Sequence, residues 1–340
     1  MLSRDPLLHV TTAADPFIAM DKMRRQRPDV ILLDLQLPRM DGLTFLGKIM
    51  AEDPIPVVIC SGFVEAGTDV AMKALEEGAV EIITKPKIGV KGFLEESAVL
   101  LSDTIRAAAQ ARLKKKTTGL TQAQLSPRPA LDWVLKPQRI GVSSARIVAI
   151  GASTGGTEAL RTLLQRMPAD CPGIVIVQHM PERFTAAFAN RLNQICTLSV
   201  KEAEDGEPVL RGAALIAPGN KHIEVKRAGA TYVVEVSDGP LVSRHRPSVD
   251  VLFRSVAKAA GPMAIGVILT GMGKDGADGL LQMRQAGALT IAQDEATSAV
   301  FGMPKESIAR GAVSEVVPLP DITDAILRSA HSVTGPLRIG

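Results

Sequence analysis

The sequence predicts an α/β protein built from two doubly wound domains with mostly parallel sheets, joined by a linker. Short apolar runs alternate with amphipathic helical segments along most of the chain, a pattern typical of parallel strands connected by helices. This alternation stops near residue 113 and resumes near residue 146. The length of 340 residues also exceeds the ~250–300 residues at which a single hydrophobic core stops growing.

The first alternating series occupies residues 1–112 and predicts the N-terminal domain. Its apolar runs predict strands at residues 8–12, 30–33, 56–60 and 81–84. Its periodic segments predict helices at residues 17–23, 42–50, 70–77 and 92–113. Helices that alternate with strands in this way connect neighbouring parallel strands of one sheet.

Residues 113–145 show neither helical nor strand periodicity and predict a linker. The segment is punctuated by Thr, Gly, Ser and Pro, and it is longer than most loops inside a compact domain. The second alternating series, residues 146–336, predicts the C-terminal domain. Strands are expected there at residues 146–150, 173–177, 213–217, 232–236, 265–269 and 290–291.

Composition excludes several classes of protein. A hydrophobic fraction of 46%, a charged fraction of 22% and a net charge of +3 indicate a soluble globular protein and do not favour a nucleic-acid partner. No apolar stretch reaches the ~18–20 residues of a membrane helix, and the first ten residues lack the apolar core of a secretory signal. The three cysteines, Cys60, Cys171 and Cys196, form no Cys-x-x-Cys pair. We therefore expect a cytoplasmic protein with reduced thiols and no membrane insertion.

Three polar residues follow three of the predicted N-terminal strands. Asp34, Ser61 and Lys85 each come directly after an apolar run. Because ligands gather at the carboxyl ends of parallel strands, we expect these side chains to meet there, where they could accept and neutralise a phosphoryl group. Taken singly, Asp34 is more simply a capping residue and Lys85 a solvated loop residue. The three together, in this order, favour the phosphoryl site.

Residues 1–87 resemble the receiver domain of two-component response regulators. The resemblance is carried by the sequence DLQLPRMDG at 34–42 and by TKP at 84–86. It implies a flavodoxin-like sheet of strand order 2-1-3-4-5, with Asp34 as the phosphoacceptor, Ser61 as the switch hydroxyl and Lys85 as a phosphate contact. Phosphorylation of receivers uses Mg²⁺.

The sequence departs from the receiver pattern at its beginning. Receivers start with a strand that ends in an acidic pair, and this pair holds Mg²⁺ together with the phosphoacceptor. The sequence begins after the place where that strand belongs. We therefore expect a receiver that lacks its first strand, either through a start site placed downstream or through degeneration, and only weak Mg²⁺ binding at Asp34.

A glycine-rich turn follows the first predicted strand of the C-terminal domain. The turn, GASTGG at 151–156, could cradle a phosphate or expose Ser153 as a nucleophile beside backbone N–H donors. Its spacing matches neither of the two common nucleotide-binding patterns, and it is not the Gly-x-Ser-x-Gly elbow of many hydrolases. Alone, Ser153 is more simply a turn residue.

Two further strand ends supply the partners of a serine nucleophile. His179 follows the run at 173–177, and Asp275 lies in the glycine-rich loop after 265–269. A Ser, a His and an Asp at three parallel-strand ends can form a catalytic triad, with Ser153 as nucleophile, His179 as base and Asp275 as the group that orients the imidazole. His245, in a polar loop, is a weaker candidate, and His222 is expected at a turn. No clustered Cys and His spacing indicates a catalytic metal.

Residues 146–335 closely resemble the chemotaxis protein-glutamate methylesterases. The matching stretches are IGASTGGTEAL at 150–160, VIVQHMP at 175–181, the segment 202–222, HRPSVDVLFRSVA at 245–257, ILTGMGKDGADGL at 268–280 and QDEATSAVFGMPKESI at 293–308. The resemblance implies hydrolysis of γ-glutamyl methyl esters on methyl-accepting chemotaxis receptors, and in many members deamidation of receptor glutamines, without a cofactor. It places the triad on Ser153, His179 and Asp275 and the oxyanion donor on the backbone N–H of Met272.

The order receiver, linker, esterase resembles the regulated form of this family. It implies that a chemotaxis histidine kinase phosphorylates the receiver and that the unphosphorylated receiver blocks the active site. Two other classes are weighed against the esterase. A non-enzymatic response regulator would be unaffected by loss of Ser153, and a DNA-binding one would need a basic helix-turn-helix after the linker instead of an α/β domain.

Overall fold

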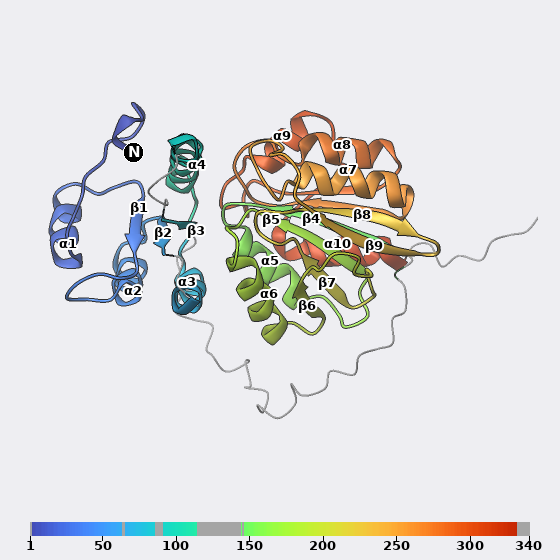
Figure 1. Cartoon of the computed structure of the whole chain (residues 1–340), viewed down its shortest axis with the longest axis horizontal. Coiled ribbons are helices and arrows are strands. Elements are labelled where there is room, and N and C mark those ends of the chain that lie inside the picture. Colours follow the sequence, from blue (N-terminus) through green and yellow to red (C-terminus); the bar gives the residue numbers. More distant parts are fainter. Residues whose placement is uncertain (1, 63–64, 86–90, 114–143, 145, 332–340) are drawn as a thin grey trace, which may run out of the picture.

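The computed structural model describes residues 2–62, 65–85, 91–113, 144 and 146–331, which form two α/β units with separate sheets (Figure 1). The predicted linker, 113–145, lies almost wholly outside the described residues. No helix among the described residues is long and apolar enough to cross a membrane.

The N-terminal unit contains a three-stranded parallel sheet of order β1-β2-β3. Its strands are β1 (Ile31–Asp34), β2 (Val57–Ser61) and β3 (Glu81–Thr84), in agreement with three of the predicted runs. Its helices are η1 (Leu2–Arg4), α1 (Pro16–Arg25), α2 (Gly42–Glu52), α3 (Glu65–Glu77) and α4 (Lys91–Ala109). Asp15 and Asp41 cap α1 and α2, because each side chain accepts a hydrogen bond from an amide of the first turn.

The strand predicted at residues 8–12 does not form, and this prediction was wrong. A strand needs a neighbour to satisfy its backbone groups, and in a 2-1-3-4-5 sheet the second strand pairs only with the first. Among the described residues no strand lies on the outer side of β1. Leu32 in β1 is accordingly 37% exposed, whereas Val57, Val58 and Ile59 in β2 are fully buried.

The C-terminal unit is built on a seven-stranded parallel sheet of order β12-β11-β10-β4-β5-β7-β6. Its central strands are β10 (Ala264–Ile268), β4 (Ile147–Ala152) and β5 (Gly173–Gln178), whose apolar residues are buried on both faces. The others are β6 (Ser199–Glu202), β7 (Ala213–Ile216), β11 (Leu289–Gln293) and β12 (Glu315–Val317). Two strands outside this sheet, β8 (His222–Ala228) and β9 (Thr231–Ser237), form an antiparallel hairpin.

Helices cover both faces of the large sheet. Figure 1 shows α5 (Gly156–Gln165), α6 (Phe184–Ile195) and α10 (Leu319–His331) on one side, with α7 (Val249–Ala260), α8 (Ala277–Gln285) and α9 (Met303–Ala309) on the other. A short 3₁₀ helix, η4 (Gly261–Met263), leads into β10. Strand β4 lies between β5 and β10, and the chain connections extend from it towards opposite edges of the sheet. At such a point a crevice is expected outside the carboxyl end of the strand.

The sequence analysis did not predict β6, β8 or β12, and His222 begins β8 instead of lying at a turn. These strands are short or half exposed, so their apolar patterns are weak. All other strands expected in the C-terminal unit form near their predicted positions.

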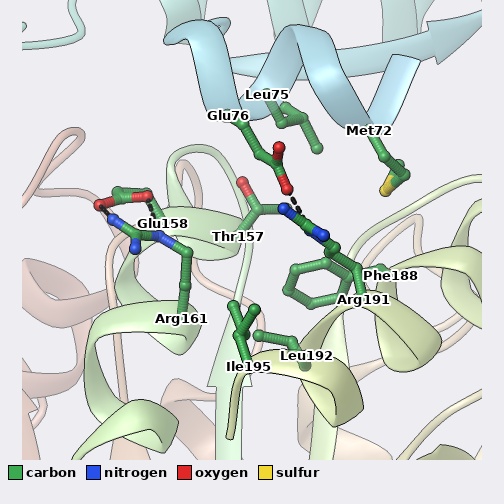
Figure 2. A pocket seen from close by; sticks show the side chains of 10 residues that line it. All are labelled: Met72, Leu75, Glu76, Thr157, Glu158, Arg161, Phe188, Arg191, Leu192 and Ile195. Carbon is green, nitrogen blue, oxygen red and sulfur yellow. Dashed lines mark hydrogen bonds and ion pairs between the residues drawn. The ribbon is translucent and has the colours of Figure 1, made fainter. Parts of the chain in front are cut away.

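The two units pack against each other through α3 of the first and α5 and α6 of the second. Met72 and Leu75 of α3 line a small pocket together with Phe188 and Leu192 of α6 (Figure 2). Buried residues of both units, including Met72 and Phe188, belong to one continuous apolar cluster.

Candidate active site

Three adjacent strands bring the predicted triad residues to one edge of the large sheet. Strand β4 pairs with β5, and the last paired residues, Ala152 and Gln178, directly precede Ser153 and His179. On its other side β4 pairs with β10, which leads into the loop that carries Asp275. The Gln178 side-chain amide donates to the carbonyl oxygens of both Ser153 and His179, each at 3.0 Å, and so ties the two strand ends together.

His179 and Asp275 are in direct contact. Nε2 of His179 lies 2.8 Å from Oδ2 of Asp275, and both side chains are almost fully buried. Nδ1 of His179 is also buried and has no hydrogen-bond partner within the described part of the chain. The imidazole is therefore oriented by the carboxylate on one side and keeps a free nitrogen on the other, which is the arrangement that a general base requires.

Asp275 lies against the N-terminus of α7. Its carboxylate accepts hydrogen bonds from the hydroxyl of Ser248 at 2.7 Å and from the amides of Val249 at 2.8 Å and Asp250 at 3.2 Å. Burial alone would raise the pKa of Asp275, but the hydrogen bond and charge of His179 and the donors of Ser248 and Val249 outweigh it and lower the pKa to about 2. The carboxylate is thus held ionised in a buried site.

Glycines allow the loops around Ser153 to approach closely. A Cβ on Gly271 would lie 2.8 Å from Cβ of Ser153, so only glycine fits there. Gly155 has φ 76°, a left-handed conformation, where the turn enters α5. The amide of Ser153 donates to the carbonyl of Thr270 at 3.0 Å. No hydrogen bond among the described residues engages the N–H of Met272, which leaves it available as a donor.

His245 lies on the imidazole of His179. Its ring stacks on that of His179 with centroids 3.8 Å apart and an angle of 11° between the planes. Burial, the charges of His179 and Arg244 and the opposing charge of Asp275 together lower the pKa of His245 to about 3, so this ring is neutral at physiological pH. His222 is structural, because its Nε2 contacts the Pro240 carbonyl at 2.8 Å and its Nδ1 accepts from the Ser248 amide at 3.2 Å.

The three residues of the predicted phosphoryl site also come together, at the carboxyl ends of β1, β2 and β3. Nζ of Lys85 lies 2.5 Å from Oδ2 of Asp34. Ser61 is buried at the end of β2, where its carbonyl accepts from the Lys85 amide at 2.9 Å. The carboxylate and the ammonium group are thus in contact, whereas the Ser61 hydroxyl donates to the Gly62 carbonyl at 3.4 Å.

The residues around Asp34 do not fit a Mg²⁺ ion. The described residues contain no group of three His, Cys, Asp or Glu side chains that could hold a metal. The charged partner of Asp34 is Lys85. A single carboxylate paired with an ammonium group is a poor ligand set for Mg²⁺.

The sequence matches known proteins along nearly the whole chain. The profile of the CheB methylesterase family matches residues 148–326, and that of the response regulator receiver domain matches residues 1–90. A relative from Anaeromyxobacter dehalogenans, named protein-glutamate methylesterase/protein-glutamine glutaminase 1, is 59% identical over 95% of this chain and 93% of its own length. The chain belongs to the CheB methylesterase family.

Further comparisons agree with this family. A relative from Geobacter metallireducens with the same type of name is 59% identical over 96% of this chain and 93% of its own length. The crystal structure of the Thermotoga maritima CheB methylesterase catalytic domain is 40% identical, covers 55% of this chain and 99% of that chain, and superposes with a TM-score of 0.53. The predicted fold class and the predicted family are confirmed.

Two site residues were missed by the sequence analysis. Ser248 appears there only within the matching stretch 245–257, yet its hydroxyl donates to Asp275. A signal was present, because Ser248-Val249-Asp250 after a proline is a typical helix start. Glu81 was assigned only to a strand, yet it lies between the two units beside Thr154. No local pattern indicates that contact.

Proposed function

We propose that this chain hydrolyses γ-glutamyl methyl esters on methyl-accepting chemotaxis receptors through a triad of Ser153, His179 and Asp275. The observation that carries the proposal is the contact between His179 and Asp275, which leaves Nδ1 of the imidazole buried and free at the strand end next to Ser153. The names of the relatives at 59% identity support the same chemistry.

The reaction follows from these positions. Ser153 Oγ attacks the ester carbonyl while Nδ1 of His179 takes its proton, and Asp275 stabilises the imidazolium that forms. The N–H of Met272 donates to the developing oxyanion. The imidazolium then protonates the leaving methoxide, which departs as methanol and leaves a glutamyl ester on Ser153. Water, activated by His179, hydrolyses that ester and restores the serine. A glutamine side chain would follow the same route with ammonia as the leaving group.

The receiver is proposed to regulate this site by covering it. The amide of Gly155, two residues after Ser153, donates to the carbonyl of Val80 in the receiver at 3.3 Å. Asp103 of α4 lies 3.4 Å from Arg244, the neighbour of His245. A receiver tethered at such short range inhibits even through weak contacts, and phosphorylation of Asp34 by a histidine kinase need only shift the docking equilibrium.

The test is methanol release from methylated receptor by the full chain and by Ser153→Ala. Loss of the nucleophile should lower kcat by about 10³-fold or more, because the remaining groups cannot form the acyl-enzyme. Ser199→Ala, at an exposed position of β6, is the matched control and should leave the rate unchanged. Equal rates for Ser153→Ala and the unmodified chain would exclude the proposed nucleophile.

A further inference from the structure

A tight turn beside the proposed triad presents one arginine to solvent. The backbone groups of Val242 and His245 hydrogen-bond to each other in both directions, at 3.1 and 2.9 Å. The two residues between them, Ser243 and Arg244, have φ of 51° and 67°. The ring of His245 stacks on that of His179 with centroids 3.8 Å apart. Arg244 therefore lies one residue away from a side chain that touches the proposed base.

The backbone of this turn is unfavourable for an arginine. Positive φ at both central residues is the geometry of a type I′ turn, which favours glycine, asparagine or aspartate. The turn is fixed at its base, because the Ser243 hydroxyl lies 3.4 Å from Oδ2 of Asp250, whose amide donates to Asp275. The Arg244 side chain, by contrast, is 77% exposed and does not pack into the fold. A strained residue held beside a reactive site in this way points to a function for its side chain.

The guanidinium of Arg244 pairs with the receiver and not with its own unit. Among the described residues its partner is Asp103 of α4, 3.4 Å away, and no hydrogen bond joins it to the esterase unit. The next arginine differs, because Arg246 donates to the Asn220 side chain at 2.8 Å and to the Gly239 carbonyl at 2.6 Å. When the receiver moves away, Arg244 therefore loses its partner, whereas Arg246 keeps its own.

The charges around this turn favour an acidic ligand. The loops that carry His179, His245 and Asp275 are fully described, and their exposed charged residues are Arg183, Arg244 and Lys274 against one acid, Glu182. A rim with an excess of positive charge attracts carboxylates. The structure also shows how a carboxylate can arrive, since Asp103 reaches Arg244 from a helix, α4.

We propose that Arg244 binds a carboxylate side chain of the substrate polypeptide, carried on a helix near the glutamyl ester, and that Asp103 takes its place while the receiver is docked. This inference rests on the proposed esterase function and adds a specificity determinant that the triad does not supply. The reaction itself provides such a carboxylate, because hydrolysis of one γ-methyl ester leaves a glutamate beside any ester that remains on the same segment. Arg244 would thus hold the substrate without touching the reacting atoms.

The experiment measures methanol release from helical peptides by the full chain. Each peptide has blocked ends, one glutamate γ-methyl ester and one glutamate placed three, four or seven residues to either side, spacings that share a helix face. A matched peptide has glutamine in place of that glutamate. For the best spacing, kcat/KM should be about three- to fivefold higher for the acidic peptide, mainly through a lower KM, which is the range of an exposed ion pair. The ratio between the two peptides cancels receiver docking, which lowers both rates alike.

Substitutions of Arg244 test whether this residue carries the preference. Arg244→Gln should bring the ratio to about one, and Arg244→Lys should keep part of it. Arg244→Gly should also abolish the preference but should not lower the midpoint of thermal unfolding, since glycine suits a positive φ. A merely structural role of the arginine would lower that midpoint instead. Arg227→Gln removes an exposed arginine from β8 and is the matched control, which should leave the ratio unchanged.

The outcomes separate this inference from the function on which it rests. If the unmodified chain shows a ratio of about one at every spacing, or if the preference survives Arg244→Gln, the role of Arg244 alone is refuted. It is equally refuted if Arg227→Gln lowers the ratio as much, because the preference would then reflect overall charge. If Ser153→Ala still releases methanol, the proposed nucleophile is wrong, while the ratio still decides on Arg244. If the unmodified chain hydrolyses neither peptide, the esterase function fails and the role of Arg244 fails with it.

Discussion

At the scale of single residues, the site depends on a carboxylate kept ionised in a buried position. A lone buried carboxylate would take up a proton, because burial disfavours its charged form. Asp275 avoids this by accepting hydrogen bonds from Ser248, Val249 and Asp250 in addition to its contact with His179. The same bonds fix the carboxylate in position, so that the imidazole is held in one orientation before substrate arrives.

We predict that Asp275→Asn lowers kcat for receptor demethylation by about 10⁴-fold with little change in KM, because an amide can no longer stabilise the imidazolium or hold its tautomer. Asp278→Asn is the control, since Asp278 lies three residues further on and pairs with Arg310 instead of a histidine. Steady-state kinetics on both variants measure the effect. A loss of less than tenfold for Asp275→Asn would contradict the role of this carboxylate.

The stability of the fold should depend on pH through the same residue. The pKa of Asp275 is lowered from 3.8 to about 2 in the folded chain. A lowered pKa means that this network stabilises the fold above about pH 4 and that its contribution is lost as the pH falls towards 2. Denaturation curves between pH 5 and 2.5 should show a smaller loss of unfolding free energy for Asp275→Asn than for the unmodified chain.

At the scale of elements, the strand β3 links the two sites of the molecule. Lys85, just after its carboxyl end, contacts Asp34, while Val80 and Glu81 at its beginning contact the esterase. Four residues in a strand span ~13 Å at about 3.3 Å per residue. A change at Asp34 therefore has a short, stiff route through one strand to the turn that carries Ser153.

Docking of β3 on the esterase should weaken as the pH rises. The pKa of Glu81 is raised from 4.5 to about 8 in the docked state. A raised pKa means that the protonated carboxyl favours docking fully below about pH 4.5, and this contribution is lost as the pH rises to 8. The esterase rate of the full chain divided by that of Glu81→Gln should therefore rise between pH 5 and 8. A flat ratio would show that Glu81 does not titrate with docking.

At the scale of the whole molecule, the interface combines an apolar contact with exposed ion pairs. Met72 and Leu75 pack near Phe188 and Leu192 (Figure 2). Around them, Arg191 pairs with Glu76, Arg112 with Glu295 and Arg244 with Asp103, through side chains that are mostly one-third or more exposed. Such an interface holds the receiver in place but leaves it sensitive to its ionic surroundings.

We predict that salt releases the receiver in part. Raising the ionic strength from about 0.05 M to 0.5 M shortens the screening length severalfold, so the three exposed pairs weaken and the esterase rate of the full chain should rise severalfold. The double variant Arg112→Ala, Arg191→Ala lacks two of these pairs and should start from a higher rate and respond less. A rate independent of salt in the unmodified chain would mean that apolar contacts alone hold the units together.

The sequence by itself determined the fold class, the family, and the residues that meet at each strand edge. Parallel strands bring their carboxyl ends together whatever else the fold does, so Ser153, His179 and Asp275, like Asp34, Ser61 and Lys85, could be grouped from local apolar runs alone. The receiver resemblance also implies that residues 8–12 have no strand to pair with. A strand was nevertheless predicted there, and it does not form.

The tertiary structure alone decided what surrounds those groups. The α7 N-terminus at Asp275, the ring of His245 on His179 and the side chain of Glu81 at Thr154 all join segments that are far apart in the chain. Local periodicity indicates which face of a helix or strand is buried, but it does not indicate which other segment packs against that face. Contacts between distant segments are fixed only when the two sheets and their helices pack, and for this reason the carboxyl beside Thr154 could not be read from the sequence.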